Sequence, residues 1–301
     1  MRGDVAVILA AVDGERPSTR ALSAFLRETR SVGGELILVD ATRFGLEPES
    51  EFAPEIRRIP AARGRLVPEL WAEGLRASET RWVAFSTTSM EPVDGWLEQL
   101  ITCQERTDAA AVGGAITPAS GLGRLDRAVY LARHAAYARP ERDAEPAGDN
   151  ALYLRRDLDR VASSWVDGFW EPEVHAALER IGASRVVDPA AVLHAIGGAR
   201  AGELFPRRFA HGVRYGTTRP LGRTGKWRVL AAPLAAAAMA ARARRGLKRA
   251  SRPIRGFGPD VWIAWGVVTA AWLLGESVGI IRRRSHATKS ATLNARLAEA
   301  V

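Results

Sequence analysis

Two glutamates and a histidine stand close together in the segment Glu171-Pro172-Glu173-Val174-His175. Proline is favoured at the first position of a helix, so Pro172 predicts a helix with Glu171 as its cap and Glu173 in its first turn. The positive end of the helix dipole favours ionised carboxylates, and a general base at neutral pH must be ionised. Glu171 and His175 share a helix face, whereas Glu173 points the other way. The alternative is a helix cap with a solvated first turn.

Polar side chains also follow two predicted buried strands. Asp40 ends one of them, and ligands of parallel α/β folds bind at the carboxyl edge of the sheet. The alternative is an ordinary strand-end aspartate that starts a turn. The other strand, at 82–85, is followed by a turn that contains Thr87, Thr88 and Ser89, which offer only hydroxyl groups. Neutral hydroxyls bind Mg²⁺ or Mn²⁺ poorly, because such an ion needs at least one hard anionic ligand from the protein.

The elements that position these residues follow an alternating order. Apolar runs at 5–10 and 35–40 predict buried strands, and between them Ser18 caps a predicted helix. This β-α-β unit predicts a parallel sheet with right-handed crossovers. Further strands are predicted at 82–85, 109–116, 186–187 and 192–193, and further helices at 66–78, 94–104, 125–138, 152–160 and 174–181. The predicted fold class is therefore α/β, with a mostly parallel sheet flanked by helices.

Composition bounds the class of protein. The 301 residues suffice for one α/β domain with an appendage or for two domains, and 47% hydrophobic residues are enough for a core. The net charge of +9 predicts an anionic partner. The single cysteine, Cys103, excludes an intrachain disulfide and is expected to be buried in a helix. The chain does not begin like a signal peptide.

The end of the chain differs in character from the rest. Residues 261–281 are apolar apart from Glu276, which predicts a transmembrane or deeply inserted helix, and 229–241 are too short to span and predict an interfacial helix. Clusters of Arg and Lys at 242–255 and 282–284 flank the apolar segment 261–281. This placement predicts an anionic membrane surface as partner, not a nucleic acid, because no nucleic-acid module is present. The alternative is two buried helices of a larger soluble domain.

Several segments together resemble family-2 glycosyltransferases of the GT-A fold, in particular a bacterial, membrane-associated subgroup. They are ELILVD (35–40), VAF with PVDGWL (83–85, 92–97), GDNALYLRR (148–156), GFWEPEVH (168–175), FAHG with YG (209–212, 215–216) and WLLGESVG (272–279). Their order and spacing carry the resemblance. It implies a GT-A-like, Rossmann-like domain at 1–215 and a basic, helical, membrane-associated tail at 216–301.

The resemblance also implies an activity. Such an enzyme transfers a sugar, with inversion, from a nucleoside-diphosphate sugar to a lipid-linked or polysaccharide acceptor of the cell envelope, at the cytoplasmic face of the membrane. Glu171 is then the catalytic base, with Glu173 and His175 near the acceptor, and Asp40 binds the nucleoside. Asn150 orients a hydroxyl or is a simple turn residue. Trp170 stacks on a sugar or belongs to the core.

The resemblance places an Asp-x-Asp metal motif where this chain has Thr87 and Ser89. A divalent metal, Mg²⁺ or Mn²⁺, is therefore a doubtful cofactor, and no metal ligand is assigned. Glu91 is a displaced substitute acid, and His194 matches a metal-chelating histidine of some members, although a structural histidine is the favoured interpretation. Three arginines, Arg207, Arg208 and Arg214, could neutralise a diphosphate in place of a metal or contact lipid headgroups.

Two other classes of function compete with this one. The first βα turn holds only Gly14, so an NAD-binding fingerprint is missing and an NAD enzyme is not expected. A degenerate GT-A domain that serves as a membrane-bound binding or scaffold subunit is the main rival, because loss of the metal-binding acids is what loss of catalysis would produce.

Overall fold

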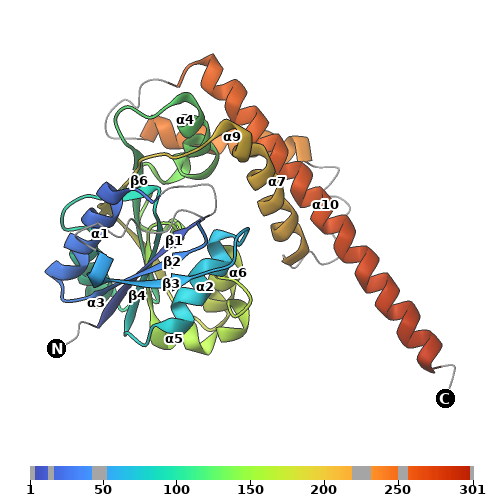
Figure 1. Ribbon diagram of the computed structural model, residues 1–301, viewed down its shortest axis with the longest axis horizontal. Helices are drawn as coiled ribbons and strands as arrows, with labels where there is room; N and C mark the ends of the chain where they lie inside the picture. The colour runs from blue at the N-terminus through green and yellow to red at the C-terminus, as the bar shows by residue number, and fades with distance from the viewer. Residues whose placement is uncertain (1–3, 13–16, 43–52, 219–231, 250–256, 299–301) are drawn as a thin grey trace.

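The computed structural model describes residues 4–12, 17–42, 53–218, 232–249 and 257–298 (Figure 1). The predicted loop at 13–16, residues 229–231 of the predicted interfacial helix, and Arg252 and Arg255 of the basic cluster lie outside these ranges.

An eight-stranded sheet forms the centre of the molecule, in the order β3-β2-β1-β4-β7-β6-β8-β5. The strands are β1 (Val5–Ala11), β2 (Glu35–Asp40), β3 (Ile56–Pro60), β4 (Trp82–Thr87), β5 (Met90–Pro92), β6 (Ala111–Pro118), β7 (Ala151–Leu154) and β8 (Arg185–Ala195). Strands β3, β2, β1 and β4 run parallel, as do β6 and β8, while β7 and β5 are antiparallel to their neighbours. The predicted α/β class with a mostly parallel sheet is confirmed.

Helices cover both faces of this sheet (Figure 1). They are α1 (Thr19–Ser31), α2 (Val67–Ala77), α3 (Trp96–Thr107), α4 (Arg124–Arg133), α5 (Arg155–Arg160), α6 (Glu171–Arg180), α7 (Ala201–Thr218), α9 (Ala232–Arg249) and α10 (Pro259–Ala298), with short 3₁₀ turns η1 (Ala53–Glu55), η2 (Ala135–Tyr137) and η3 (Ala162–Ser164). Side chains alternate across β1, so Val7 and Leu9 meet the α1 and α3 layer while Ile8 meets the α2 and α6 layer. Two cores therefore form, one on each face.

Three predicted elements differ in detail. The helix predicted at 152–160 is wrong in its first part, because Ala151–Leu154 pair with β4 and β6 as β7. The two short strands predicted at 186–187 and 192–193 are one strand, β8, with an irregularity in its pairing to β6. The polar turn after β4 contains an unpredicted strand, β5, which pairs with the end of β8.

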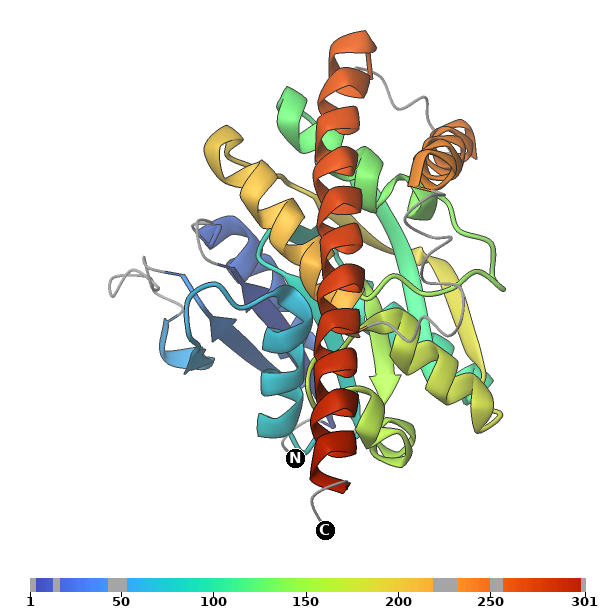
Figure 2. The same ribbon diagram turned by 90° about the vertical axis from the view of Figure 1, so that its right-hand side faces the viewer.

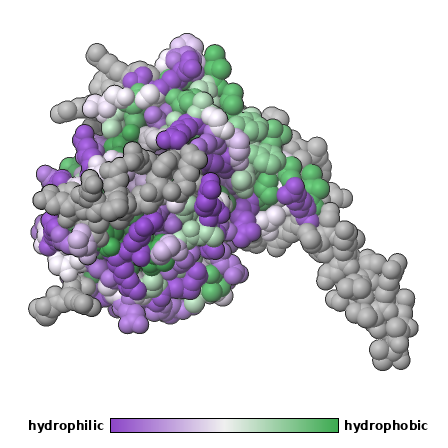
Figure 3. All heavy atoms as spheres, viewed as in Figure 1, coloured by the Kyte–Doolittle hydropathy of each residue, from purple (hydrophilic) through white to green (hydrophobic). Residues whose placement is uncertain are grey.

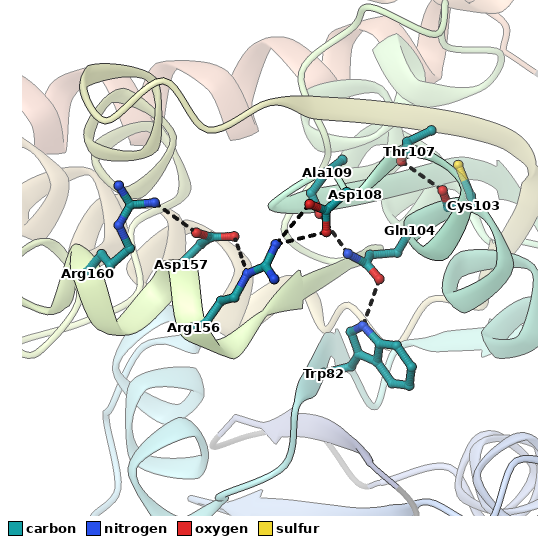
Figure 4. A network of polar contacts seen from close by, with 9 residues as sticks. All are labelled: Trp82, Cys103, Gln104, Thr107, Asp108, Ala109, Arg156, Asp157 and Arg160. Atoms are coloured by element: carbon teal, nitrogen blue, oxygen red, sulfur yellow. Dashed lines mark hydrogen bonds and ion pairs between the residues drawn. The ribbon is translucent and has the colours of Figure 1, made fainter.

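The amino-terminal end of β4 is fixed by a polar network that joins α3, β4 and α5 (Figure 4). The indole of Trp82 donates to Gln104 at 2.9 Å, and the Gln104 amide donates to the carbonyl of Ala109 at 3.3 Å. Arg156 pairs with Asp108 at 2.8 Å, and Asp108 ends α3 in the left-handed conformation. This network lies at the opposite end of β4 from the polar turn.

Helices α7 and α10 lie side by side at the edge of the sheet domain (Figures 1 and 2). Gly212 and Gly216 of α7 face Gly275 and Gly279 of α10, and a Cβ atom at any of the four would overlap backbone of the opposite helix. Four glycines spaced in two Gly-x-x-x-Gly pairs thus allow the two backbones to touch. The predicted domain boundary between 215 and 216 falls within α7.

Candidate active site

A cavity of about 560 Å³ opens at the carboxyl edge of the sheet. Its walls come from the turn after β4, the loop that precedes α2, helix α4, and the segment that runs from the end of β8 into α7. Ligands of open α/β sheets bind outside the carboxyl ends of the strands, so this cavity has the position of a ligand site.

The predicted hydroxyl turn forms part of this wall. Thr87 and Ser89 line the cavity, and their hydroxyl oxygens are hydrogen-bonded to each other at 2.9 Å. Thr88 is buried behind them, and its hydroxyl has no hydrogen-bond partner within the described residues. The turn therefore presents two neutral hydroxyls to the cavity.

Arginines dominate the charge of the cavity. Its lining contains Arg63, Arg65, Arg133, Arg200, Arg207 and Arg208. Two carboxylates stand against them in the lining. Asp126 accepts from the backbone amides of residues 198 and 199, and Glu203 lies 4.0 Å from Arg207. The cavity as folded is therefore electropositive, as a site for an anion requires.

Arg208 is the least satisfied of these arginines. Its Nε is buried and lacks a hydrogen-bond partner in the described part of the chain. Burial, and secondly the charge of Arg133, lower the pKa of Arg208 to about 9. Two neighbouring histidines do not add charge, because burial lowers the pKa of His134 to about 3 and that of His211 well below its ordinary value. An anion in the cavity would relieve the repulsion between Arg208 and Arg133.

Glu171 is not part of the described lining of this cavity. It is the first helical residue of α6, and Trp170 is the cap, so the predicted assignment of the cap to Glu171 is wrong by one position. Its carboxylate accepts a hydrogen bond from the amide of Gly148 at 3.1 Å. Burial, and secondly the charge of Asp149, raise the pKa of Glu171 to about 7. A carboxylate with this pKa can take up and release a proton near neutral pH.

Asp149 connects Glu171 to the cavity. Arg133, which lines the cavity, donates to both oxygens of Asp149 at 2.8 and 3.1 Å, and His134 lies 3.5 Å from it. Neither Asp149 nor Arg133 is among the site residues predicted from the sequence. Asp149 stands within the GDN segment that carries the resemblance, whereas Arg133 lies in a helix without any motif.

Three of the predicted site residues form hydrogen bonds or ion pairs with other residues of the protein. Asp40 is buried, with Arg58 at 2.7 Å and the amide of Thr42 at 2.8 Å, so it starts the turn after β2. The Asn150 amide accepts from the indole of Trp96 and donates to two carbonyls. His175 lies between Glu145, at 2.9 Å, and the hydroxyl of Tyr153, at 2.8 Å. None of the three is in the described lining of the cavity.

Trp170 and Glu173 occupy intermediate positions. The buried ring of Trp170 lies 5.5 Å from His211, which lines the cavity, and 6.0 Å from Tyr215. Trp170 is thus one side chain behind the wall. Glu173 is half-buried in the first turn of α6 and is not part of the described lining.

The donor set at the turn does not fit Mg²⁺ or Mn²⁺. Glu91 is paired with Arg20 at 2.7 Å, and Nδ1 of His194 shares a hydrogen bond of 2.8 Å with the hydroxyl of Thr117. Among the described residues, no group of three or more His, Cys, Asp and Glu side chains could hold a metal ion. With only hydroxyls at Thr87 and Ser89, the turn lacks the anionic ligand that these ions require.

No family model matches the chain, and no curated protein matches it. Solved structures do. The mannosyltransferase PcManGT from Pyrobaculum calidifontis, solved in complex with GDP-Man and Mn²⁺, has a TM-score of 0.52 and 16% identity over 93% of this chain and 88% of its own. TarS residues 1–349 from S. aureus have a TM-score of 0.49 and 10% identity over 90% of each chain. The chain therefore has the fold of a glycosyltransferase structure, PcManGT.

Proposed function

We propose that the protein is an inverting glycosyltransferase that uses a nucleoside-diphosphate sugar. The observation that carries the proposal is Glu171, a carboxylate with a pKa of about 7 that Asp149 and Arg133 connect to an arginine-lined cavity at the carboxyl edge of the sheet. The fold of PcManGT, whose structure contains GDP-Man, supports a nucleotide sugar as the donor class.

In this proposal Glu171 accepts the proton of an acceptor hydroxyl. The acceptor oxygen forms a bond to the anomeric carbon of the donor sugar while the bond from that carbon to the diphosphate oxygen breaks, which inverts the configuration. The proton ends on Glu171 and the electron pair on the leaving nucleoside diphosphate. Arg133 and Arg208 stabilise the negative charge that develops on the diphosphate, as fixed cations at a leaving group do.

The proposal also includes the class of acceptor. The apolar helix α10 and its basic neighbours support a lipid-linked or cell-envelope acceptor, with the sheet domain on the cytoplasmic face of the membrane. The predicted roles of Asp40 in nucleoside binding and of Asn150, Trp170, Glu173 and His175 near the acceptor require movement of the contacts described above. Glu171 must likewise leave the amide of Gly148 to meet an acceptor in the cavity, and the proposal rests on it together with Arg133 and Arg208.

A transfer assay tests the proposal. The purified protein is incubated with labelled nucleotide sugars and a bacterial lipid extract, and both labelled lipid and free nucleoside diphosphate are measured. Glu171→Gln is expected to lower kcat by about 10²–10⁴ without loss of nucleotide binding, because it removes only the proton acceptor. Glu179→Gln changes an exposed glutamate on the same helix and serves as the matched control.

A scaffold function is the second candidate. The turn after β4 presents hydroxyl groups in place of metal-binding acids, and the Asp40 carboxylate is paired with Arg58. Nucleotide binding with no turnover for any donor, and identical behaviour of Glu171→Gln and the parent protein, would favour that candidate.

A further inference from the structure

Helix α10 has two different faces over its apolar segment. The face that carries Val261, Val268, Ala271, Gly275 and Ile280 is buried against the rest of the protein. The opposite face carries an exposed apolar stripe, which consists of Ile263, Val267, Leu274 and Ile281, with exposed fractions of 71%, 54%, 56% and 56%. Residues spaced by four and seven positions lie on one side of a helix, so these four form a continuous line.

This stripe is long and faces outward. From residue 263 to 281 it extends about 27 Å at 1.5 Å per residue. Figure 2 looks onto α10, which lies in front of the sheet domain, and Figure 3 shows hydrophobic side chains gathered over α10 beside a mostly hydrophilic domain. A soluble monomer rarely exposes a contiguous apolar surface of this length, so the stripe has the character of an interaction surface.

The charges at the ends of the stripe identify its partner. At the start, Arg244 of α9 lies 5.1 Å from the ring of Trp262, the neighbour of Ile263, and Arg245 and Lys248 are exposed on the same helix. At the other end, the exposed Arg282 follows Ile281 directly. An apolar line with cationic groups at both ends matches the acyl region and the anionic headgroups of a phospholipid surface.

The packing of α10 decides how it meets the membrane. One stretch of it, Pro259–Arg282, with a mean hydropathy of 1.5, is long and apolar enough to span a bilayer by length and composition. However, α7 and α4 pack along it, and backbone contact with α7 extends from Phe209 to Thr217. If α10 crossed the bilayer, it would carry the helices packed on it, α7 and α4, into the hydrocarbon, where unpaired polar groups are costly.

We propose that the Ile263–Ile281 stripe seats the protein on an anionic lipid surface, with α10 lying in the interface and not crossing the bilayer. Helix α7 lies between α10 and the cavity. It carries the cavity-lining Arg207, Arg208 and His211, and its residues from Phe209 to Thr217 pack on α10. If the proposed function holds, α10 and α7 separate the lipid from the cavity, so a membrane-borne acceptor would approach the site past these two helices.

Vesicle co-sedimentation of the full chain tests the seating. Vesicles of phosphatidylglycerol and phosphatidylcholine are expected to bind the protein, and pure phosphatidylcholine vesicles much less. The double variant Ile263→Glu/Leu274→Glu is expected to lower partitioning by about tenfold or more, because two charges would enter the apolar region. Val166→Glu changes an apolar side chain that is 49% exposed outside α10 and is the matched control. Circular dichroism checks that all variants are folded.

Extraction at alkaline pH separates seating from spanning. Vesicle-bound protein released by carbonate supports the proposal, whereas protein that stays with the lipid shows a crossing helix and overturns it. Equal binding by the parent and the double variant also overturns it. Sedimentation velocity gives a further contrary outcome, a dimer that forms without lipid and is lost in the double variant, which would make a second copy the occupant. These outcomes do not depend on transfer activity, so failure of the seating and failure of the proposed function are distinguishable.

Discussion

Arg133 of α4 donates to both carboxylate oxygens of Asp149, and through this pair a cavity-lining cation is joined to the carboxylate that raises the pKa of Glu171. Asp149 is therefore a positioning residue, because it acts on Glu171 and is not itself in the cavity lining. Burial, and secondly the charge of Asp149, raise the pKa of Glu171 to about 7, and the charge of Arg133 opposes this rise.

Replacement of Asp149 should move the pH dependence of the reaction. Without the neighbouring negative charge, Glu171 ionises more readily, so its pKa falls and the rising limb of kcat/KM against pH shifts to lower pH in Asp149→Asn. The measurement is a pH–rate profile. The control is Asp143→Asn, an exposed aspartate in the preceding loop. An unchanged profile in Asp149→Asn would show that Asp149 does not act on the base.

Glu171 should also make the stability of the protein depend on pH. Its pKa is about 7 in the folded protein against 4.5 in a reference state, so the folded form holds the proton more tightly and the free energy of unfolding falls as pH rises from about 4.5 to 7. Glu171→Gln lacks this loss and should be more stable than the parent by about 3 kcal/mol at pH 8, with a much smaller difference near pH 4.5. Urea denaturation at the two pH values measures this. A constant difference would contradict the raised pKa.

Arg208→Met should separate stability from binding. The arginine is half-buried, with a buried, unsatisfied Nε and with the charge of Arg133 acting on it, so an apolar side chain of similar length should raise the free energy of unfolding by about 1 kcal/mol. The same change should weaken binding of a nucleoside diphosphate by about tenfold or more, because a charge-assisted contact is lost. Arg180→Met, at an exposed arginine of α6, should change neither quantity. A variant that is less stable and binds normally would place Arg208 outside the anion site.

The α7–α10 contact should control the cavity from a distance. In Gly212→Ala the new methyl group would overlap the carbonyl of Trp272, so the helices must separate and the cavity-lining side chains of α7 must shift. Nucleotide affinity and the thermal midpoint should both fall. Gly266→Ala is the matched control on α10, where a Cβ meets nothing within 4 Å, and it should be neutral or slightly stabilising. Equal effects of the two variants would contradict a role for the glycine contact.

The sequence predicted the sheet well because its strands are buried on both faces and read as continuous apolar runs. It failed at 151–154, where ALYL fits a helix or a strand, and pairing with β4 and β6 decides between them. β5 was missed because Met90–Pro92 is too short for a pattern, and only the end of β8 makes it a strand.

The residues around the candidate site could be located from the sequence only in part, for a similar reason. Helix-start signals located Glu171 to within one position, and the turn after β4 placed Thr87 and Ser89 at the cavity. Local sequence signals do not show which polar side chains will be used in hydrogen bonds and ion pairs with other parts of the protein. Asn150 and His175 are polar residues near the motif, yet tertiary contacts with Trp96, Glu145 and Tyr153 hold them elsewhere. Arg133 lies at the site because the fold places α4 there, and no sequence motif predicts that placement.

The most direct test of the account is a calorimetric titration of the protein with UDP and GDP, with Mn²⁺ and again with EDTA. Because the cavity offers arginines and neutral hydroxyls to a diphosphate, we expect one of the two nucleotides to bind with similar affinity in both conditions and more weakly to Arg208→Met. Binding that requires Mn²⁺ would contradict the arginine-based site and return Glu91 and His194 as ligand candidates. Absence of binding in every condition would contradict the proposed function itself.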